Sequence, residues 1–264
     1  MNIVVEQGNT CTKGGVFDEA GRLIHSTVCK GEDIKGLIDI VKLYGPKATI
    51  ISSVTGGEAS MRERLEGKVK GTIKIFDNMT EVPLEVRYFP PETLGRDRLA
   101  ATVGAACLYP DQDILVIDVG TAMTFEVVEA KGVYAGGSIS PGLTTRFRAL
   151  HAFTTQLPLT DEGSRELTVG HIGQTTKEAI RAGVVNGIVY EIIGYIQRMW
   201  LRYPEAIVLL TGGHANFLER LVKKELFDGK QAKKGCTFAS ERRFIVDGHL
   251  VLKGLNRILE YTLC

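Results

Sequence analysis

Two short acidic motifs, far apart in the chain, contain the residue types that bind phosphate groups. The first is Glu-Gln-Gly-Asn-Thr at 6–10, and the second is Asp-Val-Gly-Thr at 118–121. In each motif a carboxylate follows a short apolar run, at 3–5 and at 114–117, and small residues come next. Backbone N–H groups and hydroxyls in such a turn can face a phosphate, and the carboxylates can hold its cations. We therefore expect one phosphate-binding turn in each half of the chain.

The two motifs belong to a longer internal repeat. Matching positions are Val5, Glu6 and Gly8 with Ile117, Asp118 and Gly120, and then, after a one-residue gap, Thr10, Val16, Asp18 and Gly21 with Thr121, Val127, Glu129 and Gly132. A period near 111 residues predicts duplicated domains, because solenoid units are only roughly 20–50 residues long. A Gly-Asn turn is also common in ordinary β-hairpins. The duplication favours the functional interpretation.

A third motif, Gly-Arg-Asp-Arg at 95–98, follows a proline-containing stretch and begins a predicted helix. Asp97 could accept the proton of a substrate hydroxyl while Arg98 holds an anionic group, as a small-molecule kinase requires. The alternative is an Asp near a helix N-terminus that pairs with Arg at the surface. A glycine-rich turn at 136–143 opens another predicted helix, where it could approach a ligand or pack tightly.

Composition and missing motifs exclude several classes of protein. The 264 residues have a net charge of +1, which gives no support to nucleic-acid binding. We find no P-loop, no Rossmann fingerprint and no paired histidine spacing. The five cysteines form no CxxC pair, so we expect reduced thiols. Without a signal-like N-terminus or a long apolar run, we expect a cytoplasmic protein that does not enter a membrane.

Strands and helices alternate in the pattern of an α/β protein. Strands are expected at 3–5, 15–17, 47–53, 114–119 and 206–210, and helices at 33–44, 58–66, 96–108, 174–202 and 215–224. The helix at 174–202 is amphipathic, and its apolar side, with Gly183 and Gly187, suits either core packing or a subunit interface. We expect two domains, 1–112 and 113–264, with a cleft between them.

These motifs together resemble the type III pantothenate kinases, which belong to the superfamily of acetate and sugar kinases, Hsp70 and actin. The resemblance extends over nearly the whole chain and includes Tyr88, seven residues before the motif at 95–98, the segment at 136–143, Thr176, Thr-Gly-Gly at 211–213 and the closing segment at 246–255. It implies two duplicated ribonuclease H-like (actin-like ATPase) domains. It also implies ATP-dependent phosphorylation of pantothenate on its 4′-hydroxyl, the first step of coenzyme A biosynthesis.

The resemblance also implies roles for individual residues. Asp97 would be the proton acceptor, and Asp118 would bind a monovalent cation, potassium or ammonium. Pantothenate would contact Tyr88, Gly95, Arg96, Asp97, Arg98 and Thr176. ATP would contact Glu6, Gln7, Gly8, Asn9, Thr10, Cys11, Thr12, Lys13 and Thr121, with Glu6 as a ligand for Mg²⁺. A homodimer is implied as well, with its pantothenate site near the interface.

Two acidic positions depart from the pattern of the family. Glu6 and Glu126 stand where Asp is usual, which changes side-chain length but not charge. Two rival functions stay open. Glu6 is the sequence support for a nucleotide-binding regulator that has lost the kinase step, and a kinase for another small alcohol is open because a fold does not set the acceptor. Whether Arg96 or Arg98 binds the pantothenate carboxylate is open at this point.

Overall fold

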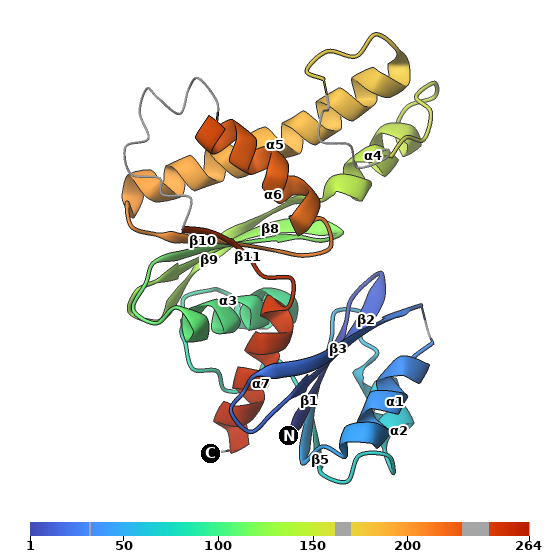
Figure 1. Ribbon diagram of the computed structural model, residues 1–264, viewed down its shortest axis with the longest axis vertical. Helices are drawn as coiled ribbons and strands as arrows, with labels where there is room; N and C mark the ends of the chain where they lie inside the picture. Colours follow the sequence, from blue (N-terminus) through green and yellow to red (C-terminus); the bar gives the residue numbers. More distant parts are fainter. Residues whose placement is uncertain (32, 162–169, 229–242, 264) are drawn as a thin grey trace. The chain divides into compact units, whose positions relative to one another are not determined.

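The computed structural model describes residues 1–31, 33–161, 170–228 and 243–263, and contains two sheets with covering helices (Figure 1). The first sheet has the order β3-β2-β1-β4-β5. Its strands are β1 (Asn2–Gln7), β2 (Cys11–Phe17), β3 (Leu23–Lys30), β4 (Ala48–Ser53) and β5 (Thr72–Ile75). β1 is antiparallel to β2 and parallel to β4, so the sheet is mixed.

The second sheet repeats this order as β9-β8-β7-β10-β11, with β6 added beyond β9. Its strands are β6 (Glu85–Val86), β7 (Ile114–Val119), β8 (Ala122–Glu129), β9 (Val133–Pro141), β10 (Ile207–Thr211) and β11 (Phe244–Val246). The parallel pair β7–β10 takes the place of β1–β4. An α/β fold with a duplicated sheet order is thus present.

The first hairpin of each sheet contains one of the two acidic motifs. In β1–β2 the Gly8 N–H donates to the Cys11 carbonyl at 3.0 Å, and in β7–β8 the Gly120 N–H donates to the Ala122 carbonyl at 3.0 Å. The second turn is therefore one residue shorter than the first. This difference coincides with the one-residue gap needed to match the two sequence motifs.

Helices cover both faces of the first sheet. On one face, α1 (Lys35–Tyr44) and α2 (Glu58–Leu65) bury apolar side chains with residues such as Ile3 and Val5. Gly14 faces α1, whereas its neighbour Gly15 faces Leu252 of α7 (Leu250–Leu263). Because side chains alternate along a strand, α7 covers the opposite face. The helix α3 (Arg96–Leu108), preceded by the short η1 (Pro91–Thr93), packs along α7.

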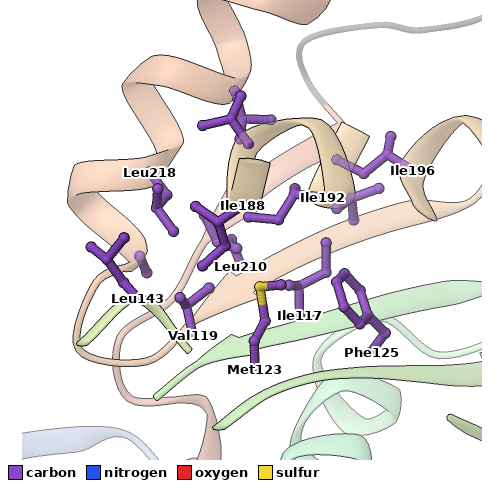
Figure 2. Packing of buried hydrophobic residues seen from close by; sticks show 14 of the residues in the cluster. Ile117, Val119, Met123, Phe125, Leu143, Ile188, Ile192, Ile196, Leu210 and Leu218 are labelled. Atoms are coloured by element: carbon purple, nitrogen blue, oxygen red, sulfur yellow. The ribbon is translucent and has the colours of Figure 1, made fainter. Parts of the chain in front are cut away.

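The helices of the second sheet are α4 (Leu143–Ala152), α5 (Thr176–Arg202), α6 (Ala215–Lys223) and η2 (Lys224–Asp228). Figure 2 shows Ile188, Ile192 and Ile196 of α5 above apolar side chains of β7 and β8, with Leu218 of α6 beside them. By length and composition α5 could cross a membrane, but 44% of its apolar window is buried in this core. The core helices of soluble proteins also satisfy these length and composition criteria. The packing of α5 against β7 and β8 confirms the core-packing interpretation of this helix.

Two compact units divide the chain. One contains residues 1–111, 128–136 and 249–264, and the other contains 112–127 and 137–248. The C-terminal helix α7 thus belongs to the same unit as β1. The domain limits 1–112 and 113–264, and the cleft between the domains, stay predictions.

The glycine-rich segment at 136–143 is mainly a strand, so the prediction of a turn there was wrong. β9 continues to Pro141, and α4 begins at Leu143. A Cβ on Gly137 would overlap Glu126 Oε2, and one on Gly142 would overlap the Gly120 carbonyl. These glycines allow neighbouring chain to approach closely, which is one of the two roles expected for the segment.

Three of the cysteines, Cys11, Cys29 and Cys107, are free thiols, as expected. Cys236 and Cys264 lie outside the described residues.

The contact between α3 and α7 gives a stability prediction. A Cβ on Gly254 would overlap the Ala100 carbonyl oxygen, whereas one on Gly194, in the interior of α5, meets no atom within 4 Å. We expect Gly254→Ala to lower the free energy of unfolding by about 1–3 kcal/mol through overpacking. Gly194→Ala should raise it by roughly 0.5–1 kcal/mol, since Ala favours helix. Urea unfolding of both variants tests this, and two changes of the same sign would contradict it.

Candidate active site

Glu6 and Lys13 lie directly opposite each other on β1 and β2. Lys13 Nζ is 3.3 Å from Glu6 Oε2, and both side chains are largely buried. The pKa of the Glu6 carboxyl is raised, mainly because burial removes water from the carboxylate. The charge of Lys13 lowers this pKa, and the charge of Asp97 raises it further. The carboxylates of Glu6 and Asp97 therefore act on each other electrostatically, while binding of phosphate by this hairpin stays a prediction.

The rest of this hairpin divides into an exposed turn and a buried base. Asn9 and Thr10 are exposed, and Gly8 and Cys11 are partly exposed, so the turn itself is accessible to a ligand. Thr12 is only 2% exposed and pairs with Gln7 and Cys29 in the sheet, so its predicted contact with ATP stays a prediction. Two further residues of the predicted ATP set lie in the strands: Gln7 is the last residue of β1, and Lys13 is the third residue of β2.

Gln7 packs against the start of α2. Its Oε1 atom is buried and has no hydrogen-bond partner among the described residues. A Cβ on Gly57, the N-cap of α2, would overlap this atom, so any other residue there would require the Gln7 side chain to move. The end of β1 and the start of α2 are thus in contact.

Asp97 occupies the first turn of α3, behind the N-cap Gly95. Its Oδ1 accepts a hydrogen bond from the Arg98 backbone N–H at 2.9 Å. A Cβ on Gly95 would lie 2.7 Å from the same oxygen, so glycine leaves room for the carboxylate. The side chain is partly exposed, which is what a proton acceptor that contacts substrate needs.

Arg98 is 6% exposed and lies among tyrosines. Its Nη2 donates to the Tyr134 hydroxyl at 3.0 Å, and its Nη1 lies 3.4 Å from the Tyr88 hydroxyl. Its guanidinium carbon is 5.3 Å from the centre of the Tyr88 ring, within cation–π range. The Tyr88 and Tyr134 rings stack at 6.2 Å. Tyr88 was expected near substrate, but Tyr134 was not found from the sequence.

Arg96 has a different environment from Arg98. Its Nη1 pairs with the carboxylate of Glu58, the first residue of α2, and donates to the Phe76 carbonyl at 3.2 Å. Glu58 was also missed from the sequence. One sequence signal could have pointed to Glu58. It directly follows Thr-Gly-Gly at 55–57, which repeats the Thr-Gly-Gly at 211–213.

The second acidic motif lies in the other compact unit. Asp118 is at the end of β7, and Thr211 pairs with it in β10. Gly212 has a φ of +96°, and a Cβ there would overlap Asp118 Oδ1. The Thr121 carbonyl accepts hydrogen bonds from the Gly142 N–H at 3.0 Å and the Thr145 hydroxyl at 2.6 Å. These contacts hold the Thr121 backbone, while its side chain is exposed.

Thr176 is the first residue of α5 and is exposed. The N-cap is its neighbour Thr175, whose hydroxyl accepts from the Glu178 N–H at 3.3 Å. Glu178 Oε2 accepts from the Thr175 N–H at 3.1 Å, which completes a capping box. Thr176 therefore has no part in capping the helix.

The predicted site residues are divided between the two compact units. The first unit contains the β1–β2 hairpin, Tyr88 and the residues at 95–98. A place beside them for Asp118, Thr121 and Thr176 stays a prediction.

Comparison with known proteins gives the same family as the motifs. The profile of the type III pantothenate kinases matches residues 2–198, a range that includes every predicted site residue. The chain belongs to this family. The type III pantothenate kinase of Bacteroides fragilis strain YCH46 is 38% identical over 262 residues, covering 99% of this chain and 98% of that protein. That of Porphyromonas gingivalis strain ATCC 33277 is also 38% identical, with 99% of both chains covered.

Solved structures show the fold. The activator of 2-hydroxyisocaproyl-CoA dehydratase from Clostridium difficile, with bound ADPNP, has a TM-score of 0.52 at 13% identity, covering 99% of this chain and 93% of that one. Component A of (R)-2-hydroxyglutaryl-CoA dehydratase from Acidaminococcus fermentans has a TM-score of 0.55 at 14% identity, covering 99% and 96%. Together with the duplicated sheets, they confirm the two ribonuclease H-like domains of an actin-like ATPase fold in this pantothenate kinase family member.

The Glu58–Arg96 pair joins α2 to α3 and gives a prediction for stability. Both side chains are mostly buried, so Glu58→Gln would leave a poorly solvated cation. We expect a loss of about 2 kcal/mol, less than the 3–5 kcal/mol typical of fully buried pairs. The matched control, Glu66→Gln, breaks an exposed pair with Arg62 at 3.6 Å and should cost under about 1 kcal/mol. Chemical denaturation compares the two, and equal losses would refute the prediction.

Proposed function

We propose that this protein transfers the terminal phosphoryl group of ATP to the 4′-hydroxyl of pantothenate, the first step of coenzyme A biosynthesis. Membership of the type III pantothenate kinase family supports the activity. The observation that carries the proposal is the position of Asp97. This carboxylate begins α3 beside the buried Arg98 and within electrostatic reach of Glu6 in the phosphate-binding hairpin.

On this proposal Asp97 accepts the proton of the 4′-hydroxyl as the oxygen bonds to phosphorus. Phosphoryl transfer depends mostly on positioning and charge neutralisation, so a base next to the acceptor and a set of donors around the phosphates are sufficient. Arg98 holds the pantothenate carboxylate, for which its planar fork of N–H donors is suited. Arg96 is the weaker candidate, because Glu58 already balances its charge.

The phosphates of ATP would lie at the turns of the two hairpins. Backbone N–H groups at Asn9 and Thr10, the Lys13 ammonium and Thr121 are the proposed contacts, because the Gly8 N–H already donates to the Cys11 carbonyl within the turn. Mg²⁺ commonly binds through one or two carboxylates together with substrate phosphates and water. The single carboxylate of Glu6, near the end of β1 and next to the turn, fits this mode of binding. When bound, the metal would neutralise phosphate charge.

We further propose that Asp118 binds the monovalent cation, potassium or ammonium. Because Gly212 has no side chain, its backbone lies close to the Oδ1 atom of Asp118. We also propose a cytoplasmic homodimer in which α5 contributes to the interface, since a Cβ on Gly183 would meet no atom of this chain within 4 Å. Light scattering that gives only a 28.9 kDa species would exclude the dimer.

The role of Asp97 gives a prediction for activity. Asp97→Asn should lower kcat at least about a hundredfold, because it removes the general base. Asp39→Asn, at an exposed position of α1, should leave kcat unchanged. ADP release is measured with ATP, magnesium and pantothenate, in potassium and in sodium buffer, and turnover should need potassium.

The same assay separates the rival functions. ATP binding without turnover by the natural chain would favour a regulator. Turnover only with another alcohol would support a kinase that acts on a substrate other than pantothenate.

The two threonines at the start of α5 give a second prediction. Thr175→Ala should lower the free energy of unfolding by about 1 kcal/mol, because it removes the N-cap. Thr176→Ala should leave stability unchanged and raise the KM for pantothenate, because its exposed hydroxyl is proposed to contact substrate. Thermal unfolding and steady-state kinetics of both variants check this. An unchanged KM in Thr176→Ala would remove Thr176 from the site.

A further inference from the structure

Tyr134 is buried beside the proposed carboxylate-binding arginine. The residue lies in β9, is fully buried, and belongs to the same compact unit as Arg98. Its hydroxyl accepts a hydrogen bond of 3.0 Å from Arg98 Nη2. Its ring stacks on Tyr88, and the Arg98 guanidinium lies near the Tyr88 ring face. Arg98 is thus oriented from two sides by a strand and by the segment before η1.

We propose that Tyr134 is a positioning residue that sets the enzyme's selectivity for an acceptor with a carboxylate. Its hydroxyl holds Nη2 of Arg98 and so fixes the plane and direction of the guanidinium. A fork of parallel N–H donors discriminates a carboxylate only when it is held in the matching plane. Tyr134 acts through Arg98 and does not itself contact the substrate.

Burial strengthens this constraint. An arginine side chain in water samples many rotamers, and ordering it on binding costs free energy. Arg98 is 6% exposed, and the Tyr134 side chain is held in place because it is fully buried and its ring is stacked on Tyr88. The guanidinium is therefore oriented before the substrate arrives. Removing only the phenolic oxygen would keep the stacked ring and release the guanidinium, which makes Tyr134→Phe an informative change.

The inference rests on the proposed function, and the experiment separates the two. Pantothenate is compared with pantothenyl alcohol, in which a CH₂OH group replaces the carboxylate. Steady-state kinetics are measured for the natural chain, for Tyr134→Phe and for Tyr195→Phe. Tyr195 is the matched control, because its ring stacks on Phe125 at 3.7 Å in the other compact unit.

We expect Tyr134→Phe to raise the KM for pantothenate by on the order of tenfold, as for loss of a hydrogen bond to a charged group. The kcat, the KM for ATP and the kcat/KM for pantothenyl alcohol should change less than about twofold. Selectivity for pantothenate over the alcohol therefore falls. Tyr195→Phe should leave this selectivity unchanged.

A second pair of variants tests whether Tyr134 acts through Arg98. Arg98→Lys keeps the charge but removes the fork, so adding Tyr134→Phe to it should cause no further loss of selectivity. Equal losses on both substrates, unchanged selectivity in Tyr134→Phe, or additive losses in the double variant would each overturn the inference. Failure of the natural chain to phosphorylate pantothenate would instead overturn the proposed function.

Discussion

Buried charge at the start of α3 is the constraint on which the rest of the first unit depends. Removing a guanidinium or carboxylate from water costs several kcal/mol unless hydrogen bonds and opposite charges replace the lost hydration. Glu58 supplies a carboxylate to Arg96, and two tyrosine hydroxyls face Arg98. These groups come from α2, β9 and the segment before η1. The start of α3 is fixed because all three elements must meet there.

The sequence was sufficient to predict the architecture, because the duplication repeats local signals. Each sheet begins with a short apolar strand, an acidic residue at its end and a tight turn, and these features depend on neighbours in the chain. The expected helix at 96–108 coincides with α3, and the expected strand at 47–53 differs from β4 by one residue. Apolar periodicity and glycine-containing turns are local properties, so they can be identified without knowledge of the packing.

The partners of the site residues could not be predicted in this way. Glu58 is 38 residues from Arg96 in the sequence, and Tyr134 is 36 residues from Arg98. Both separations are far longer than the three or four residues that bring side chains together on a helix or the two on a strand, because both contacts arise from tertiary packing. The prediction of a turn at 136–143 was wrong for a related reason. Glycine usually signals a turn, but Gly137 lies within β9 and Gly142 directly after it, where neighbouring chain passes too closely for a side chain.

Helical geometry explains why two arginines so close in sequence have such different partners. Successive residues of an α-helix are separated by about 100°, so positions 96 and 98 differ by about 200° and face nearly opposite sides of α3. Arg96 is thereby directed to Glu58 and Arg98 to Tyr134. Asp97 lies between them, about 100° from each. Anchoring both arginines restricts rotation of the first turn in either direction, and this restriction determines where the Asp97 carboxylate points.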